Sequence, residues 1–233
     1  NSLGAYTVFV GGCTNSLNSD TAHLTQSTSS NLNIPQLRLH LKMQGNASDA
    51  TGLNSTSTIG TVNYVNDRNN ASANAADFSA GYMNAAHSSN LAFTNTISIS
   101  FWLNPKSHNG CRFIDKSAGN TNNFFVDQTG TFFRVFVAQK SVLVSELPPL
   151  NTWTHISVTY NAAGSLKVYY NGVLKGTTAG ANFNLTSNNN PLFIGAVQGG
   201  SCAADARMDD VRIYGIELSN AEINTIMNAV EVT

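Results

Sequence analysis

The sequence predicts an all-β fold, an antiparallel two-sheet sandwich with one short helix near its C-terminal end. Apolar and polar residues alternate over several short segments, which is typical of strands with one buried face. The dipeptide Asn171-Gly172 separates two such segments and predicts a hairpin turn, because both residues tolerate positive φ. Helical periodicity is clear over residues 219–230, where Ser219 and Glu222 have the spacing of a capping box.

Length and charge favour one main domain with no polyanionic partner. A chain of 233 residues can bury the core of a single sandwich. Its 12 basic and 13 acidic residues nearly cancel, which predicts binding neither to nucleic acid nor to an anionic membrane. The apolar runs are all shorter than the roughly 20 residues that cross a bilayer, so we expect no membrane insertion.

The chain is expected to divide into an N-terminal arm, residues 1–34, and a larger domain, residues 35–233. Residues 4–10, GAYTVFV, form a short β-prone run. The polar residues that follow are poor in aromatics, which is typical of a linker or a loosely attached arm. Strict alternation over residues 37–43 then predicts the first strand of the domain.

Each later element is predicted from its own pattern. The turn-rich segment 45–60 is expected to be a loop. Residues 96–105, TISISFWLNP, predict a strand whose isoleucines share one face. Residues 124–138 indicate two strands joined by a turn at 128–130, and residues 152–160 alternate as a further strand.

Three segments in chain order carry a resemblance to a known family: residues 96–105, residues 151–176 and residues 206–227, ARMDDVRIYGIELSNAEINTIM. Together they resemble the laminin-G-like and pentraxin-like branch of the concanavalin A-like lectin/glucanase jelly rolls. A Gly-Asn-Ala-x-Asp-x-x-Gly turn at residues 45–52 is similar to the end of the first strand in laminin-G-like modules. The resemblance covers residues 35–230 and implies a jelly-roll sandwich that faces sugars.

We do not expect an enzyme. Retaining glycosidases need two carboxyl groups about 5 Å apart, and in laminarinase-like relatives both come from one glutamate-rich strand. None of the chain's glutamates stands in such a strand. His155 occupies the Trp-x-His position of laminin-G-like strands, where the resemblance implies a structural imidazole rather than a catalytic base. The four glutamates are Glu146, Glu217, Glu222 and Glu231.

A structural calcium ion is expected at one edge of the sandwich. Alternation places Asp209 on the inward face with Val211 and Ile213, where a carboxylate needs hydrogen-bond donors or a cation. The resemblance implies that an aspartate opening this last strand binds calcium together with backbone carbonyls. Antiparallel pairing of the first and last strands would bring the Asp49 loop near it. The alternative is that Asp209 binds loop amides and Asp49 caps a turn.

Polar side chains in two segments are candidates for a sugar site, which needs planar rings and fixed polar groups to match hydroxyls. His108 and Arg112 lie on one segment, and Asn122 and Asn123 lie on the other, near the expected concave rim. Asparagine is also abundant throughout this chain, so an ordinary polar surface explains the same residues.

The three cysteines predict one disulfide. We pair Cys111 with Cys202, because both lie in Gly-rich segments of the kind found at sandwich edges, which leaves Cys13 over. Three separate thiols, or a link to another molecule, are the alternatives.

These features predict a secreted, non-catalytic module that recognises glycans or glycoproteins outside the cell or at its surface. The low charge, 11% of residues, suits an extracellular β-protein. The alternative is a structural subunit of an extracellular filament, appendage or capsid decoration. In that case residues 4–10 would add a strand to another copy of the chain.

Overall fold

The computed structural model describes residues 7–10, 13–16, 34–109, 111–117, 123–179 and 182–229. Strands β1 (Thr7–Val10) and β2 (Cys13–Ser16) pair antiparallel and belong to a unit separate from the sandwich. Residues 4–6 of the predicted N-terminal run lie outside the described residues.

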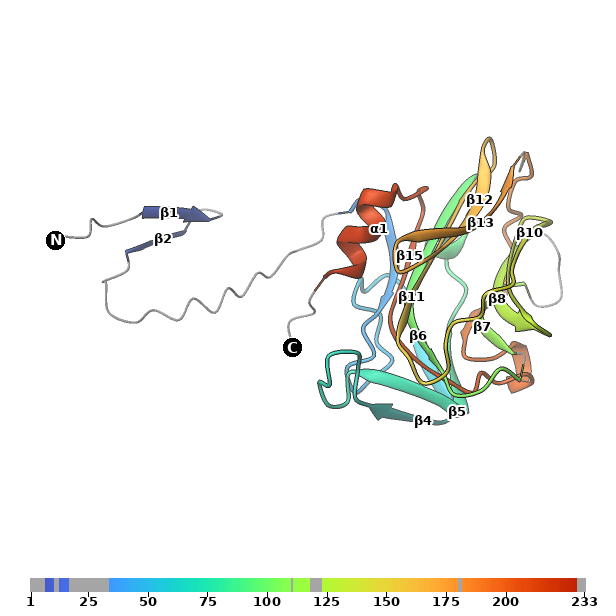
Figure 1. The fold of residues 1–233 in the computed structure, drawn as a ribbon, viewed down its shortest axis with the longest axis horizontal. Coiled ribbons are helices and arrows are strands. Elements are labelled where there is room, and N and C mark those ends of the chain that lie inside the picture. The colour runs from blue at the N-terminus through green and yellow to red at the C-terminus, as the bar shows by residue number, and fades with distance from the viewer. Residues whose placement is uncertain are drawn as a thin grey trace. The chain divides into compact units, whose positions relative to one another are not determined.

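The sandwich consists of antiparallel strands in two layers (Figure 1). One layer has the order β3-β15-β6-β11-β12-β13. Its strands are β3 (Leu37–Leu41), β15 (Ala206–Tyr214), β6 (Thr96–Pro105), β11 (Thr154–Asn161), β12 (Ser165–Tyr170) and β13 (Val173–Ala179).

The second layer has the order β10-β9-β8-β7-β14-β5-β4. Its strands are β10 (Lys140–Val144), β9 (Phe132–Val137), β8 (Phe124–Thr129), β7 (Arg112–Asp115), β14 (Leu192–Ile194), β5 (Ala75–Ala85) and β4 (Thr56–Val65). Two short 3-10 turns, Ser89–Leu91 and Gln198–Gly200, lie in the connections.

The long strand β5 joins the two layers. Its C-terminal end pairs with β14 and its N-terminal end pairs with β15, so hydrogen bonds run continuously from one layer into the other. At the far edges β10 and β13 approach each other, and Thr178 Oγ1 donates to the carbonyl oxygen of Ser141 at 2.6 Å. The sandwich is therefore nearly closed.

The hydrophobic core fills the space between the layers. The predicted alternation in β6 is confirmed, because Ile97, Ile99, Phe101 and Leu103 are all fully buried in this core. The facing strands β8 and β9 contribute Phe124 and other buried residues from the opposite side. The alternation therefore places one face of β6 in this core, as the period of two predicts, and Ser98 and Ser100 on its other face are buried as well.

Two local signals have the predicted consequences. Asn171 and Gly172 connect β12 to β13 with φ angles of 48° and 76°. Helix α1 (Asn220–Met227) begins after Ser219, whose side chain forms the capping box with Glu222. The helix ends at Met227 rather than at residue 230, because Asn228 is the C-cap.

The prediction of a loop over residues 45–60 is wrong at its end. Residues from Thr56 onward form β4, which pairs with β5 along most of its length. Most β4 side chains are exposed, so hydrogen bonding to β5 holds this strand in place. The strand therefore lacks the alternation of apolar and polar residues from which a strand is predicted in a sequence. In the part of the chain that the structure describes, no helix has the length and apolar character to cross a membrane.

Candidate functional site

A β-bulge in β15 decides where the predicted calcium ligand Asp209 lies. Asp209 pairs with Trp102 of β6, whereas Arg212 pairs with Ser100, so two residues of β15 oppose one residue of β6. Asp210, inside the bulge, has a φ of 53°. A bulge of this kind inserts one residue and shifts the alternation of faces along its strand.

The shift moves Asp209 to the outer face of the sheet. Ala206 and Met208 before the bulge, and Val211 and Ile213 after it, belong to the sandwich core. The expectation that Asp209 shares the inward face with Val211 and Ile213 is therefore wrong. Asp209 is nevertheless buried, with 3% of its surface exposed.

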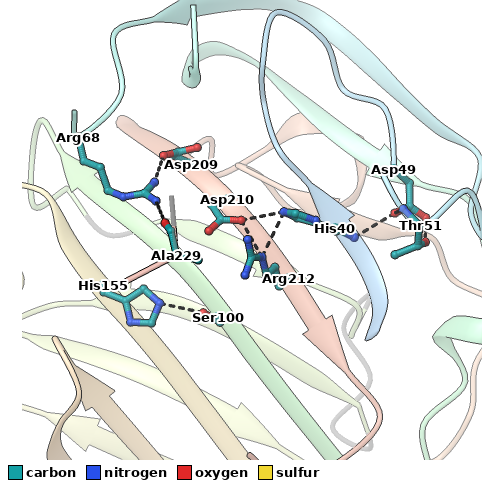
Figure 2. Close-up of polar contacts among 10 residues, drawn as sticks. All are labelled: His40, Asp49, Thr51, Arg68, Ser100, His155, Asp209, Asp210, Arg212 and Ala229. Carbon is teal, nitrogen blue, oxygen red and sulfur yellow. Dashed lines mark hydrogen bonds and ion pairs between the residues drawn. The ribbon is translucent and has the colours of Figure 1, made fainter. Parts of the chain in front are cut away.

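The cation beside Asp209 is a guanidinium group. Arg68, from the connection between β4 and β5, forms an ion pair with the carboxylate through Nη1 and donates from Nη2 to the carbonyl oxygen of Ala229 at 3.2 Å (Figure 2). Its guanidinium also lies 4.7 Å from the ring centroid of Trp102. Burial acts to raise the pKa of Asp209, the charge of Arg68 opposes that shift, and the charge of Asp210 adds to it.

A second buried ion cluster lies next to this pair. Asp210 Oδ1 is 2.8 Å from His40 Nε2 and 2.8 Å from Arg212 Nε (Figure 2). His40 comes from β3, where alternation predicts a polar face, but its side chain is buried here instead of reaching solvent. The ion pairs compensate for charges that are removed from water.

Asp49 binds its own turn. Its carboxylate accepts backbone N–H groups of His40 at 2.9 Å, Thr51 at 3.1 Å and Asn54 at 3.0 Å. The side chains of Thr51 and Asn54 donate to it as well. Burial acts to raise the pKa of Asp49, but these hydrogen bonds outweigh it and hold the pKa below its ordinary value. These contacts are those of the turn-capping alternative.

These arrangements do not fit one calcium ion shared by Asp49 and Asp209. Calcium takes six to eight oxygen ligands, whereas the oxygens of Asp49 accept bonds from their loop and Asp209 holds Arg68. Among the described residues, no group of three or more His, Cys, Asp or Glu side chains is placed to hold a metal. Calcium at this edge stays a prediction from the sequence.

His155 lies on the same outer face of the sheet as Asp209 and has the contacts of a structural residue. Its ring nitrogen Nε2 is 2.9 Å from Ser100 Oγ, and its ring lies edge-on to Trp102 with centroids 5.2 Å apart. Burial lowers the pKa of His155 to about 3, and the charges of Arg68 and Arg212 add to this shift. The imidazole is neutral near pH 7 and is 1% exposed, so it has no access to a soluble substrate.

The predicted sugar-binding residues make contacts within the protein. His108 Nε2 is 2.9 Å from the carbonyl oxygen of Pro148. Arg112 pairs with Asp127 at 3.0 Å. Asn123 is buried, and its Nδ2 donates to the carbonyl oxygen of Thr186 at 2.9 Å. Asn122 lies outside the described residues, and the role of all four in sugar binding stays a prediction.

The sulfur atoms of Cys111 and Cys202 lie 2.6 Å apart. A disulfide bond measures about 2.05 Å, so the fold brings the predicted partners within reach of that bond. The third cysteine, Cys13, opens β2 in the separate N-terminal unit. The bond itself stays a prediction.

The glutamates within the described residues have separate partners. Glu222 belongs to the capping box of α1. Glu217 binds Lys167 at 3.1 Å, and Glu146 binds Lys175 at 2.7 Å.

A pocket of about 250 Å³ opens beside the β12–β13 hairpin. Sequence reasoning missed it, because its walls come from two segments that only the fold brings together. The visible signals were Trp153 and the hairpin dipeptide. The lining residues are Glu146, Pro149, Thr152, Trp153, Thr154, Tyr170, Asn171, Val173 and Lys175. We call this the Trp153 pocket.

The Trp153 pocket combines two aromatic rings with an ion pair. Trp153 is half-buried. Lys175 Nζ lies 2.7 Å from Glu146 Oε2 and 5.9 Å from the ring centroid of Tyr170. The Tyr170 hydroxyl is buried and has no hydrogen-bond partner among the described residues. Pro149 of the lining follows Pro148, the residue that His108 contacts.

A second, more open pocket of about 420 Å³ offers amides without an aromatic wall. Its lining residues are Asn95, Asn161, Ala162, Ala163, Asn182 and Asn184.

No curated protein matches the chain at a significant level. Several solved structures share its fold. The receptor-binding domain of botulinum neurotoxin mosaic serotype C/D is 21% identical over 82% of this chain and 50% of that chain, with a TM-score of 0.66. The serotype D ligand-binding domain in complex with N-acetylneuraminic acid is 20% identical, covers 81% and 50%, and also has a TM-score of 0.66. This chain thus spans about half the length of the toxin chains.

Domain 4 of AbnA, a GH43 extracellular arabinanase from Geobacillus stearothermophilus, was solved in complex with arabinotriose. It is 19% identical over 83% of this chain and 98% of that chain, with a TM-score of 0.65. At such identities the likeness concerns the fold. A laminin G family model, described as "Concanavalin A-like lectin/glucanases superfamily", matches residues 77–224. Because this match exceeds half of the sequence, the chain belongs to the concanavalin A-like lectin/glucanase superfamily.

Proposed function

We propose that the protein is a non-catalytic, extracellular glycan-binding module and that the Trp153 pocket is its binding site. The observation that carries the proposal is the pocket itself, which places an aromatic side chain beside a partly exposed donor–acceptor pair. Ligand sites generally combine apolar walls with a few fixed polar groups in this way.

Trp153 supplies the apolar wall. Sugar rings carry C–H groups on one face, and this face packs against an aromatic ring while the hydroxyls at the edge stay available for hydrogen bonds. Indole and phenol rings bury large areas at such contacts and keep a polar group at one end.

Glu146 and Lys175 supply the polar contacts. A carboxylate accepts hydrogen bonds and an ammonium group donates them, and here the two stand 2.7 Å apart with 64% and 25% of their side chains exposed. Two neighbouring hydroxyls of one sugar satisfy both groups together, one as donor and one as acceptor. Because the two charges compensate each other, a neutral glycan fits better than a charged one.

The fold supports the same proposal. Structures of similar fold have been solved with arabinotriose and with N-acetylneuraminic acid, which shows that those proteins bind carbohydrate. Glu146 is the one carboxylate in the pocket lining. Retaining hydrolysis needs a second carboxyl group about 5 Å away, so the composition of the pocket favours binding without cleavage.

A glycan array followed by calorimetry on the best ligand tests this proposal. Trp153→Ala should weaken binding at least tenfold, or about 1.4 kcal/mol. Phe132→Ala is the matched control, because it also removes a partly exposed aromatic side chain but lies outside the pocket. Glu146→Gln and Lys175→Met should each weaken binding while the fold is retained. Equal affinity of Trp153→Ala and the control would reject this pocket.

One observation favours a structural subunit as a second candidate. Strands β1 and β2 form a two-stranded hairpin in a unit of its own, and an isolated hairpin is only marginally stable in water. Pairing with another copy of the chain would stabilise it. Sedimentation of the full chain and of a variant lacking residues 1–20 tests this: an assembly that depends on those residues supports the subunit. A monomer in both cases, with glycan binding intact, supports the binding module.

A further inference from the structure

A buried lysine outside the Trp153 pocket has an amide side chain as its neighbour. Lys116 follows β7 and is 1% exposed. Its Nζ donates to the carbonyl oxygen of Asn190 at 2.7 Å and to Asn188 Oδ1 at 3.4 Å. Within the described residues it has no ion pair with a carboxylate, and burial lowers the pKa of Lys116 to about 8. At pH 8 and above, a large fraction of the Lys116 amine is therefore neutral and nucleophilic.

The Asn188 side chain is held and polarised for attack. Its Nδ2 donates to the carbonyl oxygen of Lys116 at 2.9 Å, which fixes the amide against the lysine backbone. Its Oδ1 accepts the backbone N–H of Asn190 at 3.2 Å. A fixed N–H group on a carbonyl oxygen stabilises the negative charge that develops there when a nucleophile adds to the carbon.

We propose that Lys116 and Asn188 form an intramolecular isopeptide bond. The lone pair of the neutral Nζ adds to Cγ of Asn188, and the charge on Oδ1 is stabilised by the Asn190 N–H. When the carbonyl reforms, the Cγ–Nδ2 bond breaks and Nδ2 leaves as ammonia with one proton from Nζ. One amine and one primary amide become one secondary amide and ammonia, with no oxidant or reductant.

The bond would lock one layer of the sandwich. Lys116 lies at the end of β7 and Asn188 precedes β14, and these two strands pair with each other through Asp115 and Phe193. A covalent link here closes the chain between residues 116 and 188, which limits the unfolded state as a disulfide does. Unlike the predicted Cys111–Cys202 bond, it would survive reduction.

Mass spectrometry of the full-length protein under reducing conditions tests the proposal. We expect an intact mass that is lower than the sequence mass by one ammonia molecule, and a branched peptide that joins the segments around Lys116 and Asn188 after digestion. Lys116→Arg and Asn188→Ala should both restore the sequence mass. Lys167→Arg is the matched control and should keep the mass deficit, because this lysine pairs with Glu217 instead of an amide.

The mass measurement distinguishes the isopeptide bond from a succinimide at Asn188, and its result does not depend on whether the protein binds glycans. A succinimide at Asn188 also loses ammonia, but it yields linear peptides and persists in Lys116→Arg. Linear peptides over both segments and a full sequence mass, after incubation above the lowered pKa of Lys116, would overturn the proposal. The mass of the unmutated protein decides the matter even if a variant fails to fold, and no result depends on sugar binding.

Discussion

Arg68 and Asp209 form an ion pair on the outer face of the β15–β6–β11 sheet, where their side chains are only 9% and 4% exposed. Arg68 also donates to the carbonyl oxygen of Ala229, just beyond the end of α1. One guanidinium group therefore links three parts of the chain: the segment between β4 and β5, strand β15 and the residues after α1. The outer face of this sheet therefore carries buried polar contacts that are separate from the hydrophobic core.

Removal of Arg68 should strongly destabilise the fold. Arg68→Met leaves the Asp209 carboxylate buried without its cation, which typically costs about 3 to 5 kcal/mol. Urea unfolding measures the effect. Arg38→Met is the control, because Arg38 has an exposed contact with Gln36 and should cost less than about 0.5 kcal/mol. The double variant Arg68→Met with Asp209→Leu should recover much of the loss, and a double variant as unstable as the single one would contradict the ion-pair explanation.

The predicted calcium ion is tested by melting temperatures in chelator and in excess calcium. Because Arg68 already neutralises Asp209 and the Asp49 carboxylate accepts bonds from its own loop, we expect equal melting temperatures. Stabilisation that approaches about 2.7 kcal/mol at 100 times the dissociation constant would instead support the ion. In that case Arg68→Met should bind calcium more tightly, since the competing cation is gone.

Cys111 and Cys202 should be oxidised in protein that is folded outside a reducing compartment. Thiol titration of the denatured, unreduced chain should then find one thiol, that of Cys13. Because the bond would close a loop of about 90 residues, its reduction should cost about 4 to 5 kcal/mol. The Cys111→Ser/Cys202→Ser variant should unfold at the same urea concentration with and without reductant. Three titratable thiols in the unmutated chain would rule the bond out.

His155 should make stability fall in acid. Its folded pKa of about 3 lies below its unfolded value of 6.5, so the unfolded chain binds the proton first as the pH decreases. Between these two values the contribution of His155 should fall by about 1.4 kcal/mol per pH unit. The difference in unfolding free energy between the unmutated protein and His155→Gln isolates this effect. His87→Gln, at an exposed position, should leave the pH profile unchanged.

Local patterns in the sequence were sufficient for much of the fold. The alternation in β6, the Asn171-Gly172 turn and the Ser219 cap act over a few residues, and each has the predicted structure. Strand β4 was not predicted, and its first residues were assigned to a loop, because pairing with β5 rather than a buried face holds this strand in place. Hydrogen bonding to a neighbouring strand leaves no periodic signal in the side chains.

The site depended on contacts that the sequence could not show. Sequence reasoning identified that Asp209 needs either hydrogen-bond donors or a cation, but it could not name Arg68, which lies 141 positions earlier. The Trp153 pocket likewise combines two segments, one before β11 and one across the β12–β13 hairpin. None of its lining residues was predicted to bind sugar.

By itself the sequence determined the sandwich class, the family resemblance, the main turn and the cap of the helix, because these depend on side-chain periodicity and on backbone preferences of neighbouring residues. Only the tertiary structure decided which face Asp209 occupies, which cation it meets and where a pocket opens. A single inserted residue at the β15 bulge reverses the alternation, and the partner strand and its hydrogen bonds, not the local pattern, set where that insertion occurs.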